Sequence, residues 1–290
     1  MASIIDLVGN TPQAELKKLN PNPNVKIYAK LEGNNPGGSV KDRPALNMIR
    51  TALERGDIKP GDKLVEATSG NTGIALAMIA RLYDLEMELV MPSSSTRERT
   101  LTMEAYGATV TLLDSIEICR DYAVQKAAKG DAFILNQFSN PDNYLAHYKT
   151  TGPEIWKDTG GRITHFVSSM GTTGTIMGCS RFLKEMNPEI QIIGCQPTEE
   201  SSIPGIRRWP KEYLPEIFEP ERVDRVMDVS QQEATQMARK LAREEAIFAG
   251  MSSGGAAAAA IRLSTELDQG IIVFIACDRG DRYLSSDLFG

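Results

Sequence analysis

One lysine of this chain stands in a setting that differs from that of a solvated surface charge. Lys41 follows a turn rich in glycine and proline at residues 35–39 and precedes a segment with a helical pattern. Pro44 fits only the first turn of that helix, because proline further inside loses a hydrogen bond and clashes with the preceding turn. The helix therefore begins close to Lys41. A helix N-terminus and burial both disfavour an ammonium ion, so the pattern predicts an amine that acts as nucleophile and proton carrier.

Two loops rich in glycine and hydroxyl side chains accompany this lysine. The first consists of Thr68, Ser69, Gly70, Asn71 and Thr72, and the second of Gly171, Thr172, Thr173, Gly174 and Thr175. Each follows an apolar stretch and opens a segment with a helical pattern, so each offers the unpaired N–H groups of a helix N-terminus to an anion. The second loop contains no lysine and its glycines miss the dinucleotide spacing, which disfavours the common nucleotide-binding motifs and favours a single phosphate.

Together these segments suit a cofactor that carries an aldehyde, an aromatic ring and a phosphate. We therefore interpret Lys41 as the lysine that bonds to the aldehyde of pyridoxal 5'-phosphate (PLP), and residues 171–175 as the cradle for its phosphate. Ser69, Asn71 and Thr72 offer hydroxyl, amide and backbone donors to a carboxylate. Taken alone, each loop has a simpler explanation: the second is an ordinary strand-to-helix connection, and Asn71 is a helix cap.

A further glycine-rich segment supports two hypotheses. Gly250, Ser252 and Gly254 match the Gly-x-Ser-x-Gly turn of serine hydrolases, in which a strand precedes the serine and a histidine follows it. Both histidines of this chain, His147 and His165, lie upstream, and the segment before the serine has a helical pattern. The sequence thus disfavours a hydrolase. In the other hypothesis, the serine faces the pyridine nitrogen of PLP.

Strand and helix patterns alternate along most of the chain and position these loops. We predict strands at residues 26–31, 63–68, 87–91, 109–113, 132–137, 164–170, 191–196, 223–229 and 271–277. We predict helices at residues 71–82, 116–128, 175–186 and 231–245. Strand segments such as 271–275 lack polar alternation, as strands buried on both faces do. The pattern therefore predicts an α/β fold of repeated βα units with parallel sheets.

The composition argues against several classes of protein. The chain has 290 residues, 41% of them hydrophobic and 24% charged, as in a soluble globular protein of one large or two ordinary domains. A net charge of −6 argues against a nucleic-acid partner. No apolar run is long enough to span a membrane and the N-terminus has no secretion-signal pattern, so we expect a cytoplasmic protein. The four cysteines and two histidines show no metal-ligand spacing, and we expect no metal.

These residues carry a resemblance to a known family. The segment 34–43 resembles the lysine motif of the fold-type II PLP enzymes and, among them, of the cysteine synthases (O-acetylserine sulfhydrylases). Residues 68–72 resemble that family's asparagine loop, residues 171–175 its phosphate cradle, and Ser252 its partner of the pyridine nitrogen. The likeness runs almost end to end. It implies that contacts to the cofactor or to the substrate carboxylate fall on Thr68, Ser69, Asn71, Thr72 and Gln137.

Two further segments resemble the B isozyme of the cysteine synthases. Arg207 and Arg208 lie within residues 199–221, the least regular part of the chain, and Cys277 and Asp278 stand at the end of the last predicted strand. Adjacent arginines are otherwise solvated surface charges, and an irregular segment is otherwise a surface loop. The resemblance implies instead that one of the two arginines faces the substrate site, near the cysteine and the aspartate.

The resemblance also implies an architecture and a reaction. The architecture has two α/β domains with the cofactor between them, in a homodimer; the smaller domain comprises residues 38–143 and the larger one residues 1–37 and 144–290. The reaction replaces the acetate of O-acetyl-L-serine by sulfide to give L-cysteine, with thiosulfate as a second donor that gives S-sulfocysteine. Serine or threonine dehydratases, cystathionine β-synthases and a non-catalytic PLP-binding protein are the alternatives.

Overall fold

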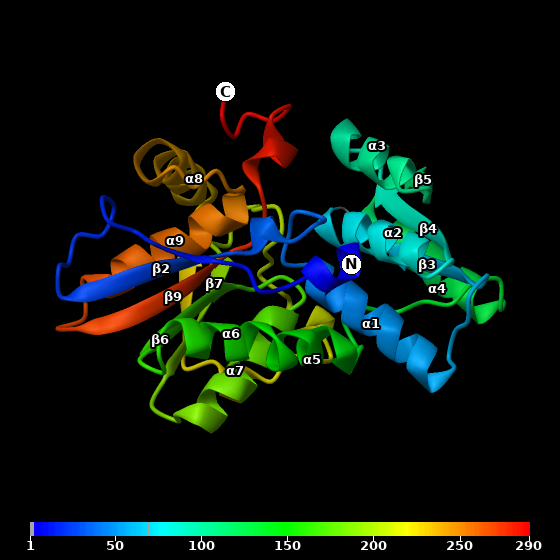
Figure 1. The fold of residues 1–290 in the computed structure, drawn as a ribbon. Helices are drawn as coiled ribbons and strands as arrows, with labels where there is room; N and C mark the ends of the chain where they lie inside the picture. Colours follow the sequence, from blue (N-terminus) through cyan, green and yellow to red (C-terminus); the bar gives the residue numbers. More distant parts are fainter. Residues whose placement is uncertain (1–2, 69) are drawn as a thin grey trace.

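Two sheets of unequal size organise the protein. The computed structural model describes residues 3–68 and 70–290. The larger sheet has six strands in the order β1-β2-β9-β6-β7-β8, and the smaller has three in the order β3-β4-β5. Figure 1 shows the two sheets side by side, each accompanied by helices, with α1 and α5 packed together where the two halves meet. The fold is therefore α/β with mostly parallel sheets, as the sequence predicted.

The larger sheet combines segments from both ends of the chain. Its strands are β1 (Gln13–Glu15), β2 (Val25–Leu31), β6 (His165–Ser169), β7 (Gln191–Pro197), β8 (Arg225–Val229) and β9 (Gly270–Ala276). Neighbouring strands pair in parallel except β1 with β2. Because β9 lies between β2 and β6, most of its residues are buried, which agrees with the absence of polar alternation in this segment.

The smaller sheet is formed by one continuous stretch of chain. Its strands are β3 (Lys63–Ala67), β4 (Glu86–Pro92) and β5 (Thr109–Leu113), all in parallel. The prediction of a full strand at residues 132–137 is wrong. This segment contributes only an isolated bridge between Phe133 and Leu64, because the backbone leaves the extended conformation at Asn136, where φ is 53°.

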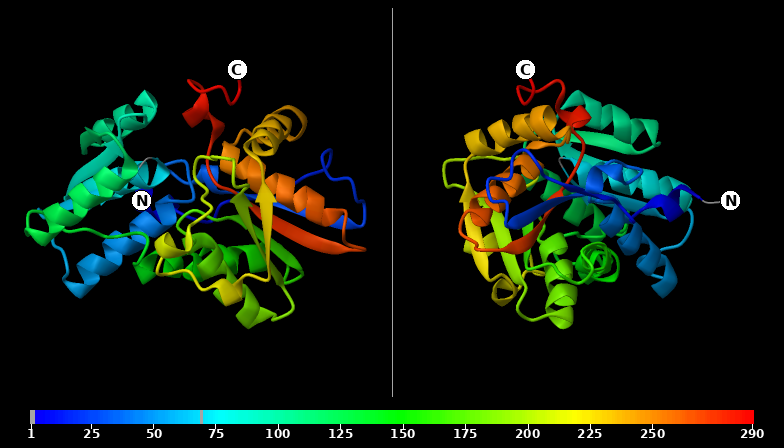
Figure 2. Two further views of the ribbon diagram at one scale, coloured as in Figure 1. Left: turned by 180° about the vertical axis from the view of Figure 1, so that it is seen from behind. Right: turned by 60° about the vertical axis from the view of Figure 1, so that its left-hand side comes forward.

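Helices cover the two faces of the larger sheet and pack on the smaller one. They are α1 (Asp42–Arg55), α2 (Asn71–Leu82), α3 (Arg97–Ala105), α4 (Ile116–Ala128), α5 (Pro141–Lys149), α6 (Thr151–Asp158), α7 (Gly174–Met186), α8 (Gln231–Glu245) and α9 (Met251–Ser264). The helices predicted at 71–82, 116–128 and 231–245 have their predicted bounds. α8 and α9 pack on one face of the larger sheet and α6 and α7 on the other, as the turned views of Figure 2 show.

The candidate site residues share one property of position. The lysine turn follows β2, the asparagine loop follows β3, the phosphate cradle follows β6, and Cys277 follows β9. All four segments therefore leave the carboxyl ends of parallel strands. In open α/β sheets this is the edge at which ligands bind, so the fold gathers residues that are far apart in the sequence.

Candidate active site

Lys41 lies immediately before α1 and is held against the end of β9. The Val40 N–H donates to the Cys277 carbonyl over 2.7 Å, and Ser39 forms an isolated bridge with Asp278. Burial lowers the pKa of the Lys41 amine, while the acidic groups of Cys277 and Asp278 oppose that shift. The amine is therefore closer to its neutral, nucleophilic form than the amine of a surface lysine.

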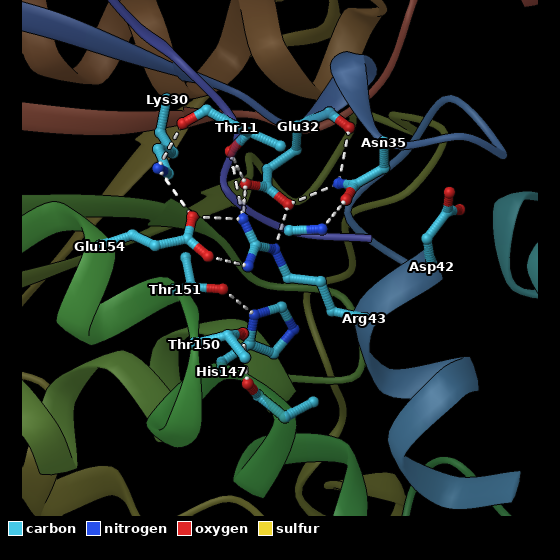
Figure 3. A network of polar contacts seen from close by, with 12 residues as sticks. Thr11, Lys30, Glu32, Asn35, Asp42, Arg43, His147, Thr150, Thr151 and Glu154 are labelled. Carbon is cyan, nitrogen blue, oxygen red and sulfur yellow. Dashed lines mark hydrogen bonds and ion pairs between the residues drawn. The ribbon is translucent and has the colours of Figure 1, made fainter. Parts of the chain in front are cut away.

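A buried network of charges fixes the first turn of α1 (Figure 3). Arg43 donates to the two carboxylate oxygens of Glu32 over 2.7 and 2.8 Å and to those of Glu154 over 2.7 Å each. Lys30 of β2 pairs with Glu154 over 2.8 Å. Each buried charge thus has an opposite partner, without which burial is costly. The network joins β2, α1 and α6, and it fixes the backbone two residues after Lys41.

The phosphate cradle lies between β6 and α7. Thr173 adopts a φ of 69° at the cap position of α7, and its hydroxyl oxygen is buried without a hydrogen-bond partner among the described residues. A Cβ on Gly171 would come within 2.5 Å of a backbone carbonyl, and one on Gly174 within 2.0 Å of Asn143 Oδ1. Both positions therefore require glycine. An unpaired hydroxyl at a helix N-terminus suits an oxyanion, so these residues fit the phosphate of PLP.

The two other threonines of the cradle are held by α5. Thr172 Oγ1 accepts from Asn143 Nδ2 over 3.2 Å, and Thr175 Oγ1 lies 3.3 Å from His147 Nε2. Burial and the neighbouring Arg43 lower the pKa of His147 to about 3, so its imidazole is neutral. The cradle is thus oriented by a neighbouring helix, and His147 is a contact that the sequence did not reveal.

The asparagine loop between β3 and α2 contacts the segment that contains Gln137. Thr68 and Thr72 are buried, and Thr72 Oγ1 donates to Gln137 Oε1 over 2.8 Å. Ser69, predicted to belong to the same site, lies outside the described residues. The structure therefore brings Thr72 into contact with Gln137, and Thr68 leads into the same loop.

The interpretation of Asn71 as a helix cap is wrong. Gly70 occupies the cap position of α2, and the Asn71 side chain is directed at the C-terminal segment instead. Asn71 Nδ2 donates to Asp278 Oδ2 over 2.7 Å, and its Oδ1 accepts from Arg282, which lies in the 3-10 helix η5 (Gly280–Tyr283). The asparagine thus links the loop after β3 to the chain after β9.

Asp278 is a buried carboxylate between the lysine and the asparagine loop. Its Oδ2 accepts from Asn71 and from the Tyr283 hydroxyl over 2.6 Å, while its Oδ1 is buried with no hydrogen-bond partner in the described part of the chain. Burial and, to a smaller extent, the adjacent Asp278 raise the pKa of the Cys277 thiol to about 12, so the thiol stays protonated. These two residues are contacts of the Lys41 segment, and the thiol is no nucleophile here.

Ser252 lies in the first turn of α9 and is buried. Ala249, three residues earlier, forms only an isolated bridge, so no strand leads into the turn. His147 hydrogen-bonds to Thr151 and Thr175, and His165 hydrogen-bonds to the adjacent Thr164. The arrangement of strand, serine and histidine that a serine hydrolase needs is absent from residues 3–68 and 70–290, and the hydrolase hypothesis is wrong.

The irregular segment 199–221 packs on the phosphate cradle. The Arg207 N–H donates to the Met170 carbonyl over 2.9 Å, and Trp209 Nε1 donates to the Gly171 carbonyl over 2.7 Å. The Trp209 ring meets the Phe138 ring edge to face at 5.6 Å. The segment therefore joins the cradle to the chain next to Gln137.

The two adjacent arginines of this segment have different surroundings. Arg208 pairs with Asp228 of β8 over 2.5 Å and donates to the Pro197 carbonyl over 2.9 Å. The Arg207 guanidinium donates to the Ile206 carbonyl over 2.9 Å and forms no ion pair within the described ranges. Burial lowers the pKa of Arg207. Of the pair, Arg207 is the one with a cation still available to an anionic ligand.

Sequence reasoning missed several buried charged residues that support the segments of the site. Arg43 stands within the lysine motif, and Glu32 follows the apolar strand β2. Glu66 is an isolated acid within the apolar strand β3. A charged residue at or near the end of a buried strand was the available signal, because such a charge needs a partner from another element.

Neither a metal centre nor a membrane span occurs in the part of the chain that the structure describes. No three or more histidine, cysteine, aspartate or glutamate side chains gather there in positions to hold a metal ion. No helix there is both long and apolar enough to cross a membrane.

Comparisons with known proteins agree with the geometry. Residues 4–278 match the family described as "Pyridoxal-phosphate dependent enzyme". The chain is 59% identical to "Cysteine synthase B" of Pseudomonas aeruginosa, an alignment that covers 99% of this chain and 97% of that protein. It is 55% identical to "Cysteine synthase B" of Escherichia coli strain K12, with 100% of this chain and 97% of that protein covered. Among solved structures, "Cysteine Synthase (OASS)" from Entamoeba histolytica matches with a TM-score of 0.94 at 35% identity, covering 100% of this chain and 90% of that one.

Proposed function

The chain belongs to the pyridoxal-phosphate dependent enzyme family, and on that premise we propose that it is a cysteine synthase. It replaces the acetate of O-acetyl-L-serine by sulfide and releases L-cysteine. The observation that carries the proposal is the partly buried Lys41, whose amine has a lowered pKa that suits proton transfer and whose segment pairs with Asp278 through Ser39. The relatives named cysteine synthase B support the choice among reactions of this family.

In this mechanism the protein supplies binding, orientation and proton transfer. PLP, when bound, withdraws electrons from the substrate's α-carbon. The Thr173 hydroxyl and the N-terminus of α7 hold the phosphate. Lys41 Nζ in its neutral form removes the α-proton of O-acetylserine, after which acetate leaves the β-carbon and sulfide adds there. The same amine then returns a proton to the α-carbon, so one group acts first as base and then as acid.

Ser252 gives the ring nitrogen a hydroxyl partner instead of a carboxylate. A hydroxyl does not hold that nitrogen protonated as an ionised carboxylate does, because it carries no charge. The ring is then a weaker acceptor of electrons, which favours elimination of acetate over reactions that need a long-lived carbanion. On this proposal Ser252 tunes the cofactor and takes no part as a nucleophile.

We expect Ser252→Ala to retain PLP, to change the visible spectrum and to reduce the rate of cysteine formation only modestly. Ser252→Asp places a carboxylate at the ring nitrogen and is expected to increase side reactions such as release of pyruvate. Absorption spectra and product analysis of both variants test this. Ser253→Ala serves as a control in the same helical turn, where the hydroxyl accepts from the Cys277 N–H over 2.9 Å. An unchanged spectrum in Ser252→Ala contradicts the assignment.

We propose that Asn71, with Ser69, Thr72 and Gln137, binds the substrate carboxylate. Asp278 already accepts from Asn71 Nδ2 over 2.7 Å, so a carboxylate suits this donor. The substrate carboxylate competes with Asp278 for the amide when it enters. Residues 38–143, the proposed smaller domain, carry Asn71 and Gln137 and would move towards the larger domain around the substrate.

Replacement of Asn71 by alanine is expected to raise the KM for O-acetylserine about tenfold, the loss typical of one hydrogen bond to a charged group, with PLP still bound. Spectral titration with O-acetylserine and the melting temperature measure the two effects. Ser230→Ala is the control, because Ser230 is a true cap of α8 that accepts from the Glu233 N–H over 3.1 Å. It should lower stability by about 1 kcal/mol with unchanged affinity. The same result for Asn71→Ala would restore a structural role for that residue.

We propose further that thiosulfate is a second sulfur donor and that Arg207 recognises it, near Cys277 and Asp278. Thiosulfate is a dianion whose oxygens accept charge-assisted hydrogen bonds from a guanidinium, and hydrosulfide has no such oxygens. The free cation of Arg207 and its position next to the cradle support this choice over Arg208, which is paired with Asp228. On the resemblance alone, we extend the proposal to a homodimeric enzyme in the cytoplasm.

One measurement tests the proposed reaction as a whole. The purified protein should show the visible absorption of PLP, and O-acetylserine should change that absorption in a way that sulfide reverses. Product analysis then distinguishes the alternatives: cysteine identifies a cysteine synthase, ammonia and pyruvate a dehydratase, and cystathionine from homocysteine a cystathionine β-synthase. A spectrum that does not respond to O-acetylserine would reject the reaction while leaving PLP binding intact.

A further inference from the structure

Glu66 is a buried acid to which the mechanism above gives no role. It lies on β3, where its neighbours Val65 and Ala67 are buried in the core. Its Oε2 accepts the Asn136 N–H over 3.1 Å, and its Oε1 accepts the Gln137 N–H over 3.4 Å. Within residues 3–68 and 70–290 it forms no ion pair. Among the described residues, this carboxylate forms its hydrogen bonds with backbone N–H groups and with no side chain.

Burial and these N–H donors have opposite effects on the pKa of Glu66. Burial raises its pKa to about 7, while the N–H groups of residues 135–137 and the positive charge of Arg120 on α4 oppose the rise. A protonated carboxyl offers fewer acceptor sites to the two N–H groups than the ionised form. The ionised carboxylate is therefore the form that holds both.

The polar groups of Gln137 are held at three points. Its N–H donates to Glu66, its carbonyl accepts from Asn143 Nδ2 over 2.7 Å, and its Oε1 accepts from Thr72 Oγ1 over 2.8 Å. The remaining group is the side-chain Nε2, which can only donate. This arrangement fixes the other polar groups of the residue and leaves Nε2 as the donor group that a ligand could use.

The backbone next to Gln137 needs such support. Asn136 adopts a φ of 53°, a left-handed conformation that is uncommon for residues other than glycine. Its carbonyl accepts from the N–H groups of Ser139 and Asn140, so the turn into α5 starts here. Glu66 accepts from the N–H groups of both Asn136 and Gln137, and it therefore fixes the direction of the backbone at Gln137.

We propose that Glu66 is a positioning residue for the substrate carboxylate. Through the two N–H groups it holds Gln137 so that Nε2 faces the amino acid beside the asparagine loop. β3 then supplies both parts of the carboxylate site, because the loop continues from its end and Glu66 holds Gln137 from its side. This inference rests on the proposed function, in which Gln137 contacts that carboxylate.

The test is the substitution Glu66→Gln with a matched control. Glutamine keeps the size of the side chain but presents an amide, which cannot accept from both N–H groups. We expect the KM for O-acetylserine to rise about threefold to tenfold, with kcat at saturation and the PLP content within twofold of wild type. Glu88→Gln is the control: Glu88 is equally buried on the adjacent strand β4, and its partners are Lys63, Tyr122 and Lys126. It should lower the melting temperature and leave the KM unchanged.

A double-mutant cycle separates positioning from general loosening of the fold. In a Gln137→Ala background, Glu66→Gln should cause no further rise in KM, because the group that it positions is gone. Glu66→Asp keeps the charge but has a side chain shorter by one methylene, and it should also raise the KM for O-acetylserine. This variant replaces Glu66→Gln if the glutamine variant does not fold.

Three results would overturn the inference: an unchanged KM in Glu66→Gln or Glu66→Asp, an equal rise in Glu88→Gln, or additive effects in the cycle. Failure of the proposed function is a different outcome, since the wild-type protein would then make no cysteine from O-acetylserine and sulfide. The positioning role is therefore tested only if the wild-type protein is active. In that case the KM values of the variants decide it directly.

Discussion

Lys41→Ala should lose turnover by several orders of magnitude while the protein still holds PLP noncovalently. Loss of a general base alone costs about 10²–10⁴-fold, and the same amine also forms the bond to the cofactor. The cradle remains intact in this variant, because Thr173 and the glycines of residues 171–175 lie on another element. Steady-state rates of cysteine formation and the absorption spectrum of the purified variant measure the two effects.

Borohydride reduction provides the matching chemical test. In the wild-type protein it should fix the cofactor to the peptide that contains Lys41, and in Lys41→Ala to no peptide. Lys30 is an internal control, because its amine is also buried but is paired with Glu154 over 2.8 Å. The peptide that contains Lys30 should stay unlabelled. Near-native turnover in Lys41→Ala, or label on another lysine, would contradict the central assignment.

Local patterns in the sequence were enough to predict the elements that carry the site. The bounds of α2, α4 and α8 follow from a helical period that begins after a glycine or serine, and Pro44 locates the start of α1. These signals depend on neighbouring residues only. The exception is residues 132–137, where an apolar strand pattern contains the turn at Asn136. Hydrogen bonds of that segment with Glu66 and with Asn143 of α5 fix the turn and override its strand propensity.

Contacts between distant residues could not be predicted in this way. Asn71 and Asp278 are 207 positions apart, and each alone has a simpler local explanation. Arg43 and Glu154 are separated by 111 positions, and no pattern in either segment predicts that the two residues form a pair. Such pairs form because the carboxyl ends of β2, β3, β6 and β9 meet, and that depends on the order of strands in the sheets. The resemblance to a family, and no physical reasoning from the sequence, supplied the expectation that these segments form one site.

Arg207 carries the second large effect, which concerns the choice of sulfur donor. We expect Arg207→Ala to reduce kcat/KM for thiosulfate about tenfold to more than a hundredfold, the loss of one charge-assisted hydrogen bond of roughly 1.5–3 kcal/mol. The rate with sulfide should change little, because hydrosulfide has no oxygen that accepts from the guanidinium. Initial rates of S-sulfocysteine and of cysteine formation, measured on the same preparation, give the ratio directly.

Arg208→Ala is the matched control for this prediction. Its guanidinium pairs with Asp228 over 2.5 Å and donates to the Pro197 carbonyl, so its removal affects the edge of the larger sheet at β8. We expect some loss of thermal stability and an unchanged ratio of thiosulfate to sulfide activity. If the ratio falls in Arg208→Ala and not in Arg207→Ala, the roles of the two arginines are reversed. If both donors lose equally in Arg207→Ala, the side chain supports the segment beside the cradle through its bond to the Ile206 carbonyl and selects no donor, because a structural defect there slows both reactions alike.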